Sequence, residues 1–478
     1  MSQQTEHRTT DVVVIGGGPT GENLAARVVA KGLQAVLVEA ELVGGECSFW
    51  ACMPSKALLR PGAALAAARR VPGAAEAVTG RLDVGRVLQR RDELAEHWDD
   101  ADQVKWAEGA GVTLERGHGR LVAERTVEVT AGGGDLVTWT ARHAVVLATG
   151  SEPVTPDITG LAGVPHWGSR EATSARQVPD RLAVIGGGVI AVEMAQAYAR
   201  LGSTVTVVTA SPLLSRAETR AGELVADALR ADGVELRAAT RCTTVARDGE
   251  DGEVTLTLDQ GRQVVADELL VATGRRPRTG DVGLESVGLD GDEPLDVDGT
   301  GLVGGVPGRW LYAAGDVTGA APLTHMGKYA ARIVGSAVAA RAAGHDAAEG
   351  DWAPHRTTAL HRAVTQVVFT DPEVTSVGLT AQQAQDAGIS TRVVDLDLAV
   401  AGSAVHADGY TGWARMVVDT DREVLVGVTF VGQDVAELLH SATVAVVGEV
   451  PLSRLWHAVP SFPTISEIWL RLLEEYGL

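Results

Sequence analysis

The stretch of sequence that decides the fold is residues 11–40, DVVVIGGGPTGENLAARVVAKGLQAVLVEA. It begins with an apolar run that predicts a buried strand, and Gly16, Gly18 and Gly21 follow at GxGxxG spacing before a helical pattern. Such glycines allow a tight turn and bring backbone N–H groups close to a pyrophosphate at a helix N-terminus. A second strand ends at Glu39, about 20 residues further on, where a carboxylate could accept a hydrogen bond from a ribose hydroxyl. The stretch therefore predicts a dinucleotide-binding unit.

The same pattern recurs in residues 181–216, RLAVIGGGVIAVEMAQAYARLGSTVTVVTASPLLSR. Here Gly186 and Gly188 follow a strand, and the second strand ends at Thr209 instead of an acidic residue. Because no carboxylate would repel a 2′-phosphate there, and because Arg216 could pair with one, the pattern favours NADPH over NADH. A solvated surface role for Arg216 is the alternative. Two such units in one chain indicate two different dinucleotides.

Three further strand-like stretches end at small or polar residues. The stretch WLYAAGDVTG places Asp316 at a strand end, where its carboxylate could bond a polyol chain or cap a helix. Residues 145–151 (VVLATGS) and 269–277 (LLVATGRRP) are apolar and break at Thr-Gly. We expect these two stretches to be crossing points between one nucleotide-binding domain and the other.

Length, composition and charge limit the classes of protein to consider. At 478 residues the chain is expected to form about three domains, and its 45% hydrophobic and 22% charged residues are typical of a globular protein. A formal net charge of −21 argues against a basic face for nucleic acid or for an anionic membrane. No apolar run is long enough to span a membrane, and the first residues lack a secretory signal pattern, so we expect a cytoplasmic protein.

Two of the three cysteines, Cys47 and Cys52, lie close together in residues 44–56, GGECSFWACMPSK. Three cysteines do not form a structural disulfide framework, and in a reducing compartment a close pair is more often catalytic or metal-binding. No further cysteine or paired histidine follows at ligand spacing, so we expect no metal site. The residues alone leave two interpretations, a redox-active disulfide or two inert core residues.

The spacing of this pair sets a geometric condition. Residues five apart in an ideal helix have Cα atoms roughly 8–9 Å apart, whereas a disulfide needs less than about 7 Å. We therefore expect the segment to bend where a loop enters a helix, which Gly44 and Gly45 permit. The start of that helix, with Lys56 nearby, is expected to lower a thiol pKa.

Taken together, these motifs resemble the FAD-dependent pyridine nucleotide-disulfide oxidoreductases, the group of glutathione reductase, dihydrolipoamide dehydrogenase and mercuric reductase. The resemblance covers nearly the whole chain and rests on the order of GxGxxG, GGECSFWACMPSK, VLATGS, the second nucleotide fold, ATGRRP, GDVTG…LTH and VFTDPEVTSVGLT. It implies an α/β fold with two Rossmann-like dinucleotide-binding domains, for FAD and NAD(P), and a C-terminal α+β dimerisation domain. The implied domains are a discontinuous FAD domain (1–150 and 276–350), an NAD(P) domain (151–275) and an interface domain (351–478) that closes a homodimer.

The resemblance also implies roles for individual residues. Lys56 and Glu193 resemble the ion pair beside the flavin and nicotinamide rings. Cys52 would lie against the flavin, and Cys47 would face the substrate. The implied FAD contacts are pyrophosphate and ribose contacts at Gly16, Gly18, Gly21 and Glu39, a ribityl contact at Asp316, and a backbone contact beside the flavin ring at Thr324 and His325.

One residue departs from the family's pattern. Members that act on thiols and disulfides carry His-Pro-Thr-x-x-Glu near the C-terminus, whereas here Phe462 occupies the histidine position and is followed by Pro463, Thr464 and Glu467. A phenyl ring cannot exchange a proton, and losing a general acid–base typically costs about 10²–10⁴-fold in rate. We therefore expect NAD(P)H to reduce FAD and the disulfide, with poor turnover of glutathione-like or lipoamide-like disulfides.

Two nearby residues are candidates to replace the missing histidine. His457 is a candidate by proximity only, and packing or a helix end is its more ordinary interpretation. Glu467 could act alone if burial raised its pKa, or it is a remaining orienting group. Mercuric reductase also lacks this histidine but depends on extra cysteines near the C-terminus. This chain ends LRLLEEYGL with none, so mercury reduction is disfavoured.

Two hypotheses for the function follow. The first is an NAD(P)H-dependent flavoprotein that passes electrons through FAD to the disulfide of Cys47 and Cys52 and on to a small disulfide or thiol-reactive acceptor. The second is an NAD(P)H:quinone or dye reductase that uses the flavin directly, which Phe462 and the apolar redox loop favour. A non-catalytic flavoprotein is disfavoured because both nucleotide sites have complete motifs.

Overall fold

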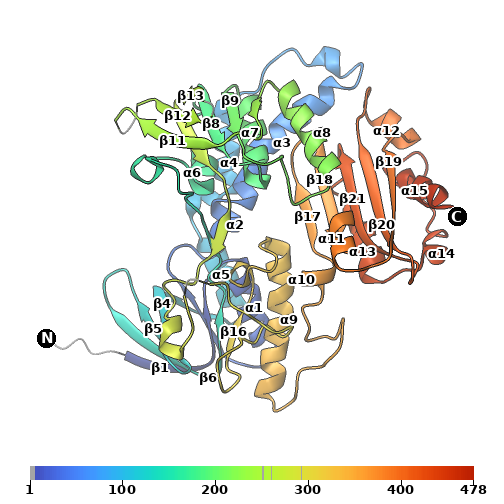
Figure 1. The fold of residues 1–478 in the computed structure, drawn as a ribbon. Helices are drawn as coiled ribbons and strands as arrows, with labels where there is room; N and C mark the ends of the chain where they lie inside the picture. Colours follow the sequence, from blue (N-terminus) through green and yellow to red (C-terminus); the bar gives the residue numbers. More distant parts are fainter. Residues whose placement is uncertain (1–5, 250–251, 260, 292) are drawn as a thin grey trace. The chain divides into compact units, whose positions relative to one another are not determined.

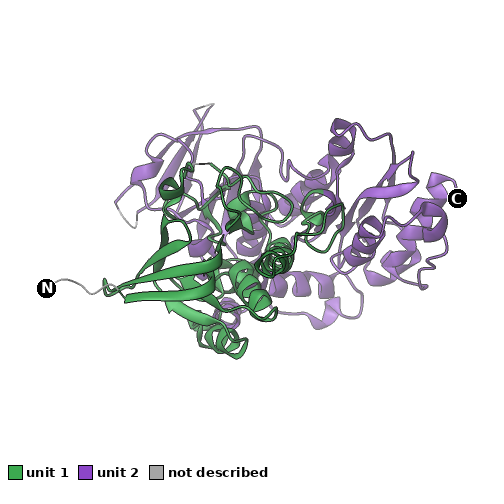
Figure 2. Ribbon diagram, turned by 90° about the horizontal axis from the view of Figure 1, so that it is seen from below, with its two compact units in different colours: residues 1–52, 95–152, 275–361 green, residues 53–94, 153–274, 362–478 purple. Residues whose placement is uncertain are grey.

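The computed structural model describes residues 6–249, 252–259, 261–291 and 293–478. The chain divides into two compact units, which Figure 2 shows in different colours. Unit 1 comprises Met1–Cys52, Ala95–Glu152 and Arg275–His361, and unit 2 comprises Met53–Leu94, Pro153–Gly274 and Arg362–Leu478. Within the described ranges, no helix is both long enough and apolar enough to cross a membrane.

Unit 1 is built on a seven-stranded sheet with the order β3-β2-β1-β6-β5-β4, in which β16 also pairs with β6 (Figure 1). Strand β2 pairs in parallel with β1 and β3, and β6 pairs in parallel with β1 and β16. Strand β5 pairs antiparallel with β4 and β6. The strands are β1 (Glu6–Ile15), β2 (Ala35–Glu39), β3 (Thr113–Arg116), β4 (His118–Ala123), β5 (Thr126–Thr130), β6 (Leu136–Leu147) and β16 (Leu311–Ala313). The helices of unit 1 include α1 (Pro19–Val29), α2 (Gly45–Phe49), α5 (Ala101–Gly109) and α9 (Thr324–Ala342).

The centre of this sheet is buried on both faces, as expected for parallel strands. Val12 and Val14 of β1 belong to a core cluster that includes residues of α1 and α9. Val13 and Ile15 belong to a second cluster, formed with residues of β4, β5 and β6. All four side chains are at most 4% exposed. The continuous apolar run of β1 therefore reflects a strand that is covered on both sides.

The turn between β1 and α1 requires glycine. Gly16 adopts a φ of +105°, and a Cβ atom added to Gly21 would lie 1.8 Å from the carbonyl oxygen of Gly16. Only glycine therefore lets α1 begin this close to the end of β1. The N-terminus of α1 consequently lies at the carboxyl end of the parallel strands, where ligands bind in open α/β sheets.

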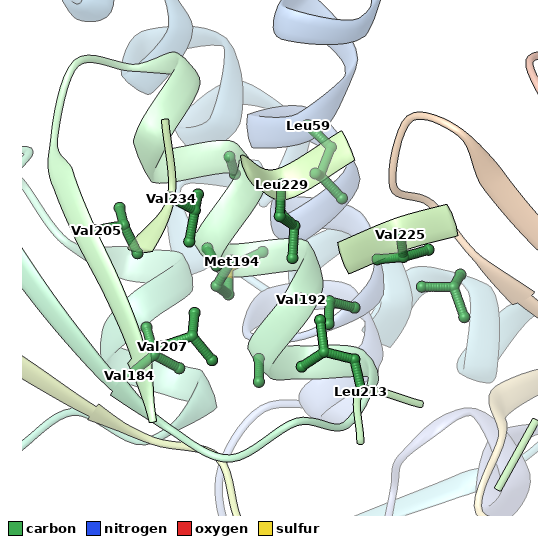
Figure 3. Close-up of a cluster of buried hydrophobic side chains, with 14 of the residues drawn as sticks. Leu59, Val184, Val192, Met194, Val205, Val207, Leu213, Val225, Leu229 and Val234 are labelled. Carbon is green, nitrogen blue, oxygen red and sulfur yellow. The ribbon is translucent and has the colours of Figure 1, made fainter. Parts of the chain in front are cut away.

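Unit 2 contains a second parallel sheet, with the strand order β10-β9-β8-β14. Figure 3 shows the core on one side of it, where Val184 and Val207 of the strands lie with Val192 and Met194 of α7. Leu59 from the long helix α3 reaches the same core. The elements of this region are β8 (Arg181–Ile185), β9 (Thr204–Val208), β10 (Glu235–Arg237), β14 (Glu268–Val271), α3 (Cys52–Arg69), α4 (Val84–Leu94), α6 (Ser169–Ser174), α7 (Val189–Arg200) and α8 (Thr219–Ala231).

Two smaller sheets accompany these. An antiparallel sheet of unit 2 consists of β11 (Cys242–Arg247), β12 (Val254–Leu258) and β13 (Gln263–Ala266). Two short strands, β7 (Ser151–Pro153) and β15 (Arg275–Pro277), pair with each other. The chain leaves unit 1 after Glu152, shortly after Thr149-Gly150. It returns to unit 1 at Arg275, directly after Thr273-Gly274.

The C-terminal part of unit 2 is a five-stranded antiparallel sheet with helices (Figure 1). Its strand order is β17-β18-β21-β20-β19. The strands are β17 (Thr365–Val368), β18 (Glu373–Gly378), β19 (Thr391–Asp397), β20 (Trp413–Asp419) and β21 (Val424–Gly432). The helices are α11 (Ala381–Asp386), α12 (Ala401–His406), α13 (Leu439–Val447), α14 (Leu452–Leu455) and α15 (Ile468–Tyr476), and the short α10 (Ala359–Arg362) precedes the sheet.

The fold class predicted from the sequence is confirmed. Two sheets with parallel strands, one of them mixed, carry the two glycine-rich turns, and an α+β region follows them. The individual strands differ in length from the sequence pattern, since β1 already begins at Glu6. The division into three domains at residues 150, 275 and 350 remains a prediction.

Candidate active site

The first glycine-rich turn of unit 1 is closed by the side chain of Glu39. Its Oε2 accepts a hydrogen bond from the backbone N–H of Gly17 at 2.5 Å, and its Oε1 accepts one from Glu41 at 2.7 Å. Burial raises the pKa of the Glu39 carboxyl although both backbone donors oppose the shift. The sequence placed this acceptor at the end of β2, and the structure puts it directly beside the turn.

The surface of this turn fits the pyrophosphate and ribose of FAD. Gly18 is the N-cap of α1, and no side chain caps that helix end, so its first N–H groups can donate to an anion. A Cβ atom added to Gly18 would find its nearest neighbour only at 4.0 Å, and one added to Gly45 would lie 2.8 Å from the Cα of Gly18. Two bare glycines thus face each other at the helix end and leave room that side chains would fill.

A polar network links Asp316 to the residue before Cys47. Asp316 Oδ2 accepts from the Ser151 hydroxyl at 2.7 Å, and that hydroxyl also accepts from Arg275 Nε at 2.9 Å. Arg275 Nη2 in turn donates to Glu46 Oε2 at 2.5 Å. Burial raises the pKa of Asp316, and the bond from Ser151 and the charge of Arg275 oppose that rise. The sequence did not predict Ser151, Arg275 and Glu46 as site residues, although the first two belong to the noted stretches 145–151 and 269–277.

The two cysteines of the redox segment lie on different helices. Cys47 belongs to α2, which ends at Phe49, and Cys52 is the first residue of α3. The helical path breaks at Trp50, whose φ is −137° and ψ is 0°, so the bend falls between the cysteines and not only at Gly44 and Gly45. All three cysteines lie in the described part of the chain and carry reduced thiols.

The thiols of Cys47 and Cys52 are hydrogen-bonded to each other. Cys52 Sγ also lies 3.2 Å from the hydroxyl oxygen of Thr324, at the start of α9. The bond to Cys52, followed by burial, raises the pKa of Cys47, while Thr324 and Lys328 oppose the shift. This direction is opposite to the lowered thiol pKa expected from the sequence.

The structure brings the predicted residues of α9 to this segment. Thr324 is its first residue, and no side chain caps that end of the helix. His325 follows and is exposed. Unit 1 therefore places the predicted residues of the turn, the cysteines, Asp316 and the start of α9 in one part of its structure, at the ends of parallel strands.

The predicted ion pair is present in unit 2. Lys56 Nζ of α3 donates to Glu193 Oε2 of α7 at 2.9 Å, and the Glu193 side chain is only 4% exposed. Glu193 Oε1 accepts from the backbone N–H of Phe369 at 2.9 Å, and Lys56 Nζ lies 4.9 Å from the centroid of the Phe369 ring. Both carboxylate oxygens are thus satisfied. Phe369 was not predicted as a site residue, although it belongs to a motif that the sequence analysis had noted.

Close packing of α3 on α7 holds this pair in place. A Cβ atom added to Gly62 would lie 2.9 Å from Cδ of Arg200, so the two helices approach each other through a glycine. Arg200 itself bonds Asp371 at 2.9 Å and Asp232 at 2.9 Å. The charged side chains around the pair are therefore themselves fixed by partners.

The second glycine-rich turn fits a nicotinamide dinucleotide. Gly186 adopts a φ of +133°, and Gly188 is the N-cap of α7, again without a side-chain cap. A Cβ atom added to Gly188 would meet nothing within 4 Å. Thr209 is buried directly after β9, and Arg216 is exposed and makes no hydrogen bond or ion pair to any residue described. The turn therefore leaves both space and an available cation near the strand end that lacks an acid.

The segment with the missing histidine forms a small pocket in unit 2. Phe462 is 77% exposed, and Glu467 is buried beside it. Glu467 Oε1 accepts from Arg471 at 2.7 Å, whereas its Oε2 is buried and has no hydrogen-bond partner within the described chain. The cavity has a volume of about 150 Å³ and is lined by Trp456, Ala458, Val459, Pro460, Ser461, Phe462, Glu467, Leu470 and Leu473. His457 is exposed just after α14, so it occupies a helix end.

Comparison with known proteins gives matches over nearly the whole chain. Residues 10–344 match the family described as pyridine nucleotide-disulphide oxidoreductase, and residues 364–472 match its dimerisation domain. Mercuric reductase of Shigella flexneri is 32% identical over 93% of this chain and 77% of its own length. Dihydrolipoyl dehydrogenase of Thermus scotoductus is also 32% identical, over 96% of both chains.

Solved structures show the same fold. LpdA from Mycobacterium tuberculosis matches with a TM-score of 0.81 at 24% identity, covering 99% of this chain and 100% of its own. The HOCl-induced flavoprotein disulfide reductase RclA from Escherichia coli, as its Cu(II) complex, matches with a TM-score of 0.81 at 22% identity, over 98% and 99% of the two chains. At these identities the likeness concerns the fold.

Proposed function

The chain belongs to the pyridine nucleotide-disulphide oxidoreductase family, and from this premise we propose that it passes electrons from NAD(P)H through FAD to a disulfide of Cys47 and Cys52 and on to a small disulfide or thiol-reactive acceptor. Family members are flavoprotein oxidoreductases that use FAD and NAD(P)H. The observation that carries the proposal is the hydrogen-bonded pair of thiols beside Thr324. Two inert core cysteines would not need a break between helices that turns them toward each other.

We propose that FAD binds to unit 1. Bound FAD supplies the two-electron carrier between the nicotinamide and the disulfide. The N-terminus of α1 would hold its pyrophosphate, Glu39 a ribose hydroxyl, and Asp316 the ribityl chain, with Ser151 and Arg275 fixing that carboxylate. The Thr324–His325 backbone would lie beside the flavin ring, in line with the family resemblance.

The chemistry of the two cysteines follows from thiol–disulfide exchange. The Cys47 thiolate attacks one sulfur of an acceptor disulfide, and the first thiolate leaves as a mixed disulfide forms. The Cys52 thiolate then attacks Cys47 Sγ, which releases the second thiolate and closes the internal disulfide. Because Cys47 must lose its proton first and its pKa is raised, the attack is expected to accelerate as the pH rises through the alkaline range.

Lys56 and Glu193 would form the ion pair beside the flavin and nicotinamide rings. Their pair is held by Phe369 on one side and by packing of α3 on α7 on the other, so the ammonium group keeps a fixed position. We propose NADPH as the donor because Arg216 is available near a strand end without a carboxylate. Gly188 leaves space at the turn for the pyrophosphate, and Gly186 lets the chain pass close to the backbone of Ala272.

The surroundings of Phe462 favour a second candidate function. Phe462 is 77% exposed and Val459 85% exposed, and the phenyl ring that stands at the histidine position cannot protonate a leaving thiolate. A quinone accepts electrons directly from the flavin and can take its protons from water. An NAD(P)H:quinone or dye reductase is therefore the alternative, with the cysteines secondary.

The proposal also covers the oligomeric state, the partners and the cellular location of the protein. The chain carries the family's dimerisation domain at residues 364–472, and we propose a homodimer. The acceptor would be a small molecule, and neither nucleic acid nor a membrane is proposed as a partner because the net charge is −21. We propose a cytoplasmic location because three cysteines in 478 residues do not form the structural disulfide framework that is typical of secreted proteins.

Serine variants of the cysteines separate the two candidate functions. NADPH oxidation would be measured for the wild type, Cys47→Ser and Cys52→Ser, with Cys242→Ser as the matched control. The acceptors would be lipoamide, glutathione disulfide, an aromatic disulfide whose low-pKa thiolate leaves without a proton, and a naphthoquinone. The proposed function predicts that both serine variants lose disulfide reduction by roughly 10²-fold or more while the control does not. A wild type that reduces only the quinone, at a rate that neither serine variant alters, would overturn it in favour of the alternative.

A further inference from the structure

Residues 44–52, which contain Cys47 and Cys52, are here called the redox loop. A short segment of the same unit, residues 96–103 and here called the strap, is hydrogen-bonded to this loop and to the residue before it. Trp98 Nε1 donates a hydrogen bond to the backbone carbonyl oxygen of Phe49 at 3.0 Å. Phe49 is the last residue of α2 and lies between the two cysteines in the sequence. Asp100 Oδ2 accepts from the backbone N–H of Val43 at 2.7 Å, just before the loop. The strap therefore holds the redox loop at its start and at a point between the two cysteines.

The other contacts of the strap make it a fixed support. Asp100 Oδ2 also accepts from Arg116 Nη2 at 2.6 Å, and Arg116 Nη1 donates to the carbonyl oxygen of Glu41 at 2.8 Å. A Cβ atom added to Gly44 would lie 3.2 Å from Cγ of Gln103, so this side chain covers the glycine that starts the loop. The strap is thus tied to the sheet strand β3 as well as to the loop.

The backbone of the strap adopts a conformation that its sequence does not favour. Glu96, His97 and Trp98 have φ values of 49°, 51° and 58°, and none of them is glycine. Three successive L-residues in the left-handed region are disfavoured because each Cβ approaches the following carbonyl. Such a conformation persists only where the surroundings determine it, and it is often found where function requires a side chain in one place. Here the left-handed turn presents the Trp98 indole N–H to the redox loop.

We propose that Trp98 is a positioning residue that sets the thiol–disulfide equilibrium of Cys47 and Cys52 by holding the loop between them. The inference rests on the proposed function, in which these cysteines form the redox centre. With Phe49 anchored, the loop keeps the bent shape in which the two thiols meet, and their effective concentration is high. Releasing this anchor gives the loop more conformations, so the disulfide becomes less favourable relative to the dithiol.

The test measures this equilibrium in the full-length, FAD-loaded protein. Wild type, Trp98→Phe and Trp106→Phe are equilibrated anaerobically in buffers of oxidised and reduced dithiothreitol, then alkylated and read by mass spectrometry. Oxidation of the pair forms one S–S bond and releases two electrons and two protons, which oxidised dithiothreitol takes up as its own S–S bond opens. Trp106, 48% exposed on α5 of the same unit, is the matched control, and Cys242 serves as the internal alkylation reference.

The expected result is a shift of the Trp98→Phe equilibrium toward the dithiol by about fivefold, since one hydrogen bond is lost while the ring is kept. That shift corresponds to about 20 mV in midpoint potential, and Trp106→Phe should match the wild type. A reversible wild-type disulfide with an unchanged Trp98→Phe equilibrium would overturn the role of the strap and leave the proposed function standing. A wild type that forms no disulfide between Cys47 and Cys52 at any buffer ratio would overturn both.

A second variant covers the case in which Trp98→Phe does not fold or bind FAD. Asp100→Asn keeps an acceptor for Val43 but removes the charge that strengthens its bonds to Val43 and Arg116. It is expected to shift the equilibrium in the same direction by about twofold. An equilibrium that is unchanged, or shifted toward the disulfide, in Asp100→Asn would contradict the inference.

Discussion

Glu467 keeps one carboxylate oxygen bonded to Arg471 and leaves the other buried beside Phe462. Within the described chain that second oxygen has no hydrogen-bond partner, and a buried acceptor without a partner typically costs about 1–3 kcal/mol. An imidazole at position 462 could supply the missing donor and would also exchange protons with a leaving thiol. The prediction that Glu467 is the orienting carboxylate of a pair whose acid–base member is replaced by Phe462 rests on this unpaired oxygen.

Replacing Phe462 with histidine tests this interpretation directly. Phe462→His is expected to raise the turnover of glutathione disulfide or lipoamide by tenfold or more, because general acid–base catalysis contributes about 10²–10⁴-fold. The measurement is steady-state NADPH oxidation with each disulfide, and Phe462→Leu is the control for the loss of the ring. Equal rates for the histidine and leucine variants would argue that a missing proton donor does not limit turnover.

Lys56 stabilises a carboxylate that is almost entirely buried. Its own side chain is 34% exposed, whereas that of Glu193 is 4% exposed. Removing the ammonium group leaves the Glu193 charge with only the N–H of Phe369. The penalty therefore falls mainly on the carboxylate and not on the partly solvated lysine.

This asymmetry predicts the outcome of a double-mutant cycle. Lys56→Met is expected to lower the free energy of unfolding by about 1–2 kcal/mol, after discounting for the exposure of the lysine. Adding Glu193→Gln should recover most of that loss, since no buried charge then lacks a counterion. Thermal unfolding of the wild type, both single variants and the double variant gives the four values. Additive losses in the double variant would contradict the account.

At the scale of elements, the proposed redox site combines a break between α2 and α3 with the strap that bonds Phe49, the last residue of α2. The break at Trp50 lets Cys47 and Cys52 approach, which one continuous helix would prevent. The strap stores conformational strain, at roughly 1–2 kcal/mol for each left-handed L-residue. Local stability and redox function are thus opposed in residues 96–98.

Relieving this strain should stabilise the protein. His97→Gly, at a φ of 51°, is expected to raise the free energy of unfolding by about 1 kcal/mol, because glycine adopts that conformation without a Cβ clash. The Trp98 contact is kept, so the dithiol equilibrium should stay at its wild-type value. Lys105→Gly on the nearby helix α5 is the control and should destabilise by about 1 kcal/mol. A melting temperature of His97→Gly below that of the wild type would refute the assignment of strain.

At the scale of the whole molecule, the sequence predicted those features whose residues lie close together in the chain. The two glycine-rich turns and the Cys47–Cys52 pair each lie within one short stretch, and the Lys56–Glu193 pair came from the family resemblance. Trp98 could not be predicted because Glu-His-Trp contains no glycine or asparagine to indicate a left-handed turn. Arg275 and Glu46 could not be paired because 229 residues separate them. The sequence predicted a lowered pKa for one thiol of the pair without saying which, and the pKa of Cys47 is raised because of the neighbouring Cys52 thiol and burial.

The central claim is that Cys47 and Cys52 are a working redox centre coupled to FAD. An anaerobic reductive titration of the purified protein, counting electrons per FAD and free thiols, tests it most directly. The account predicts about four electrons per FAD, a long-wavelength absorbance band at the midpoint from a thiolate beside the flavin, and a rise from Cys242 alone to all three cysteines as titratable thiols. Uptake of about two electrons, without the band and without new thiols, would contradict the claim and leave direct reduction of quinone-like acceptors as the function.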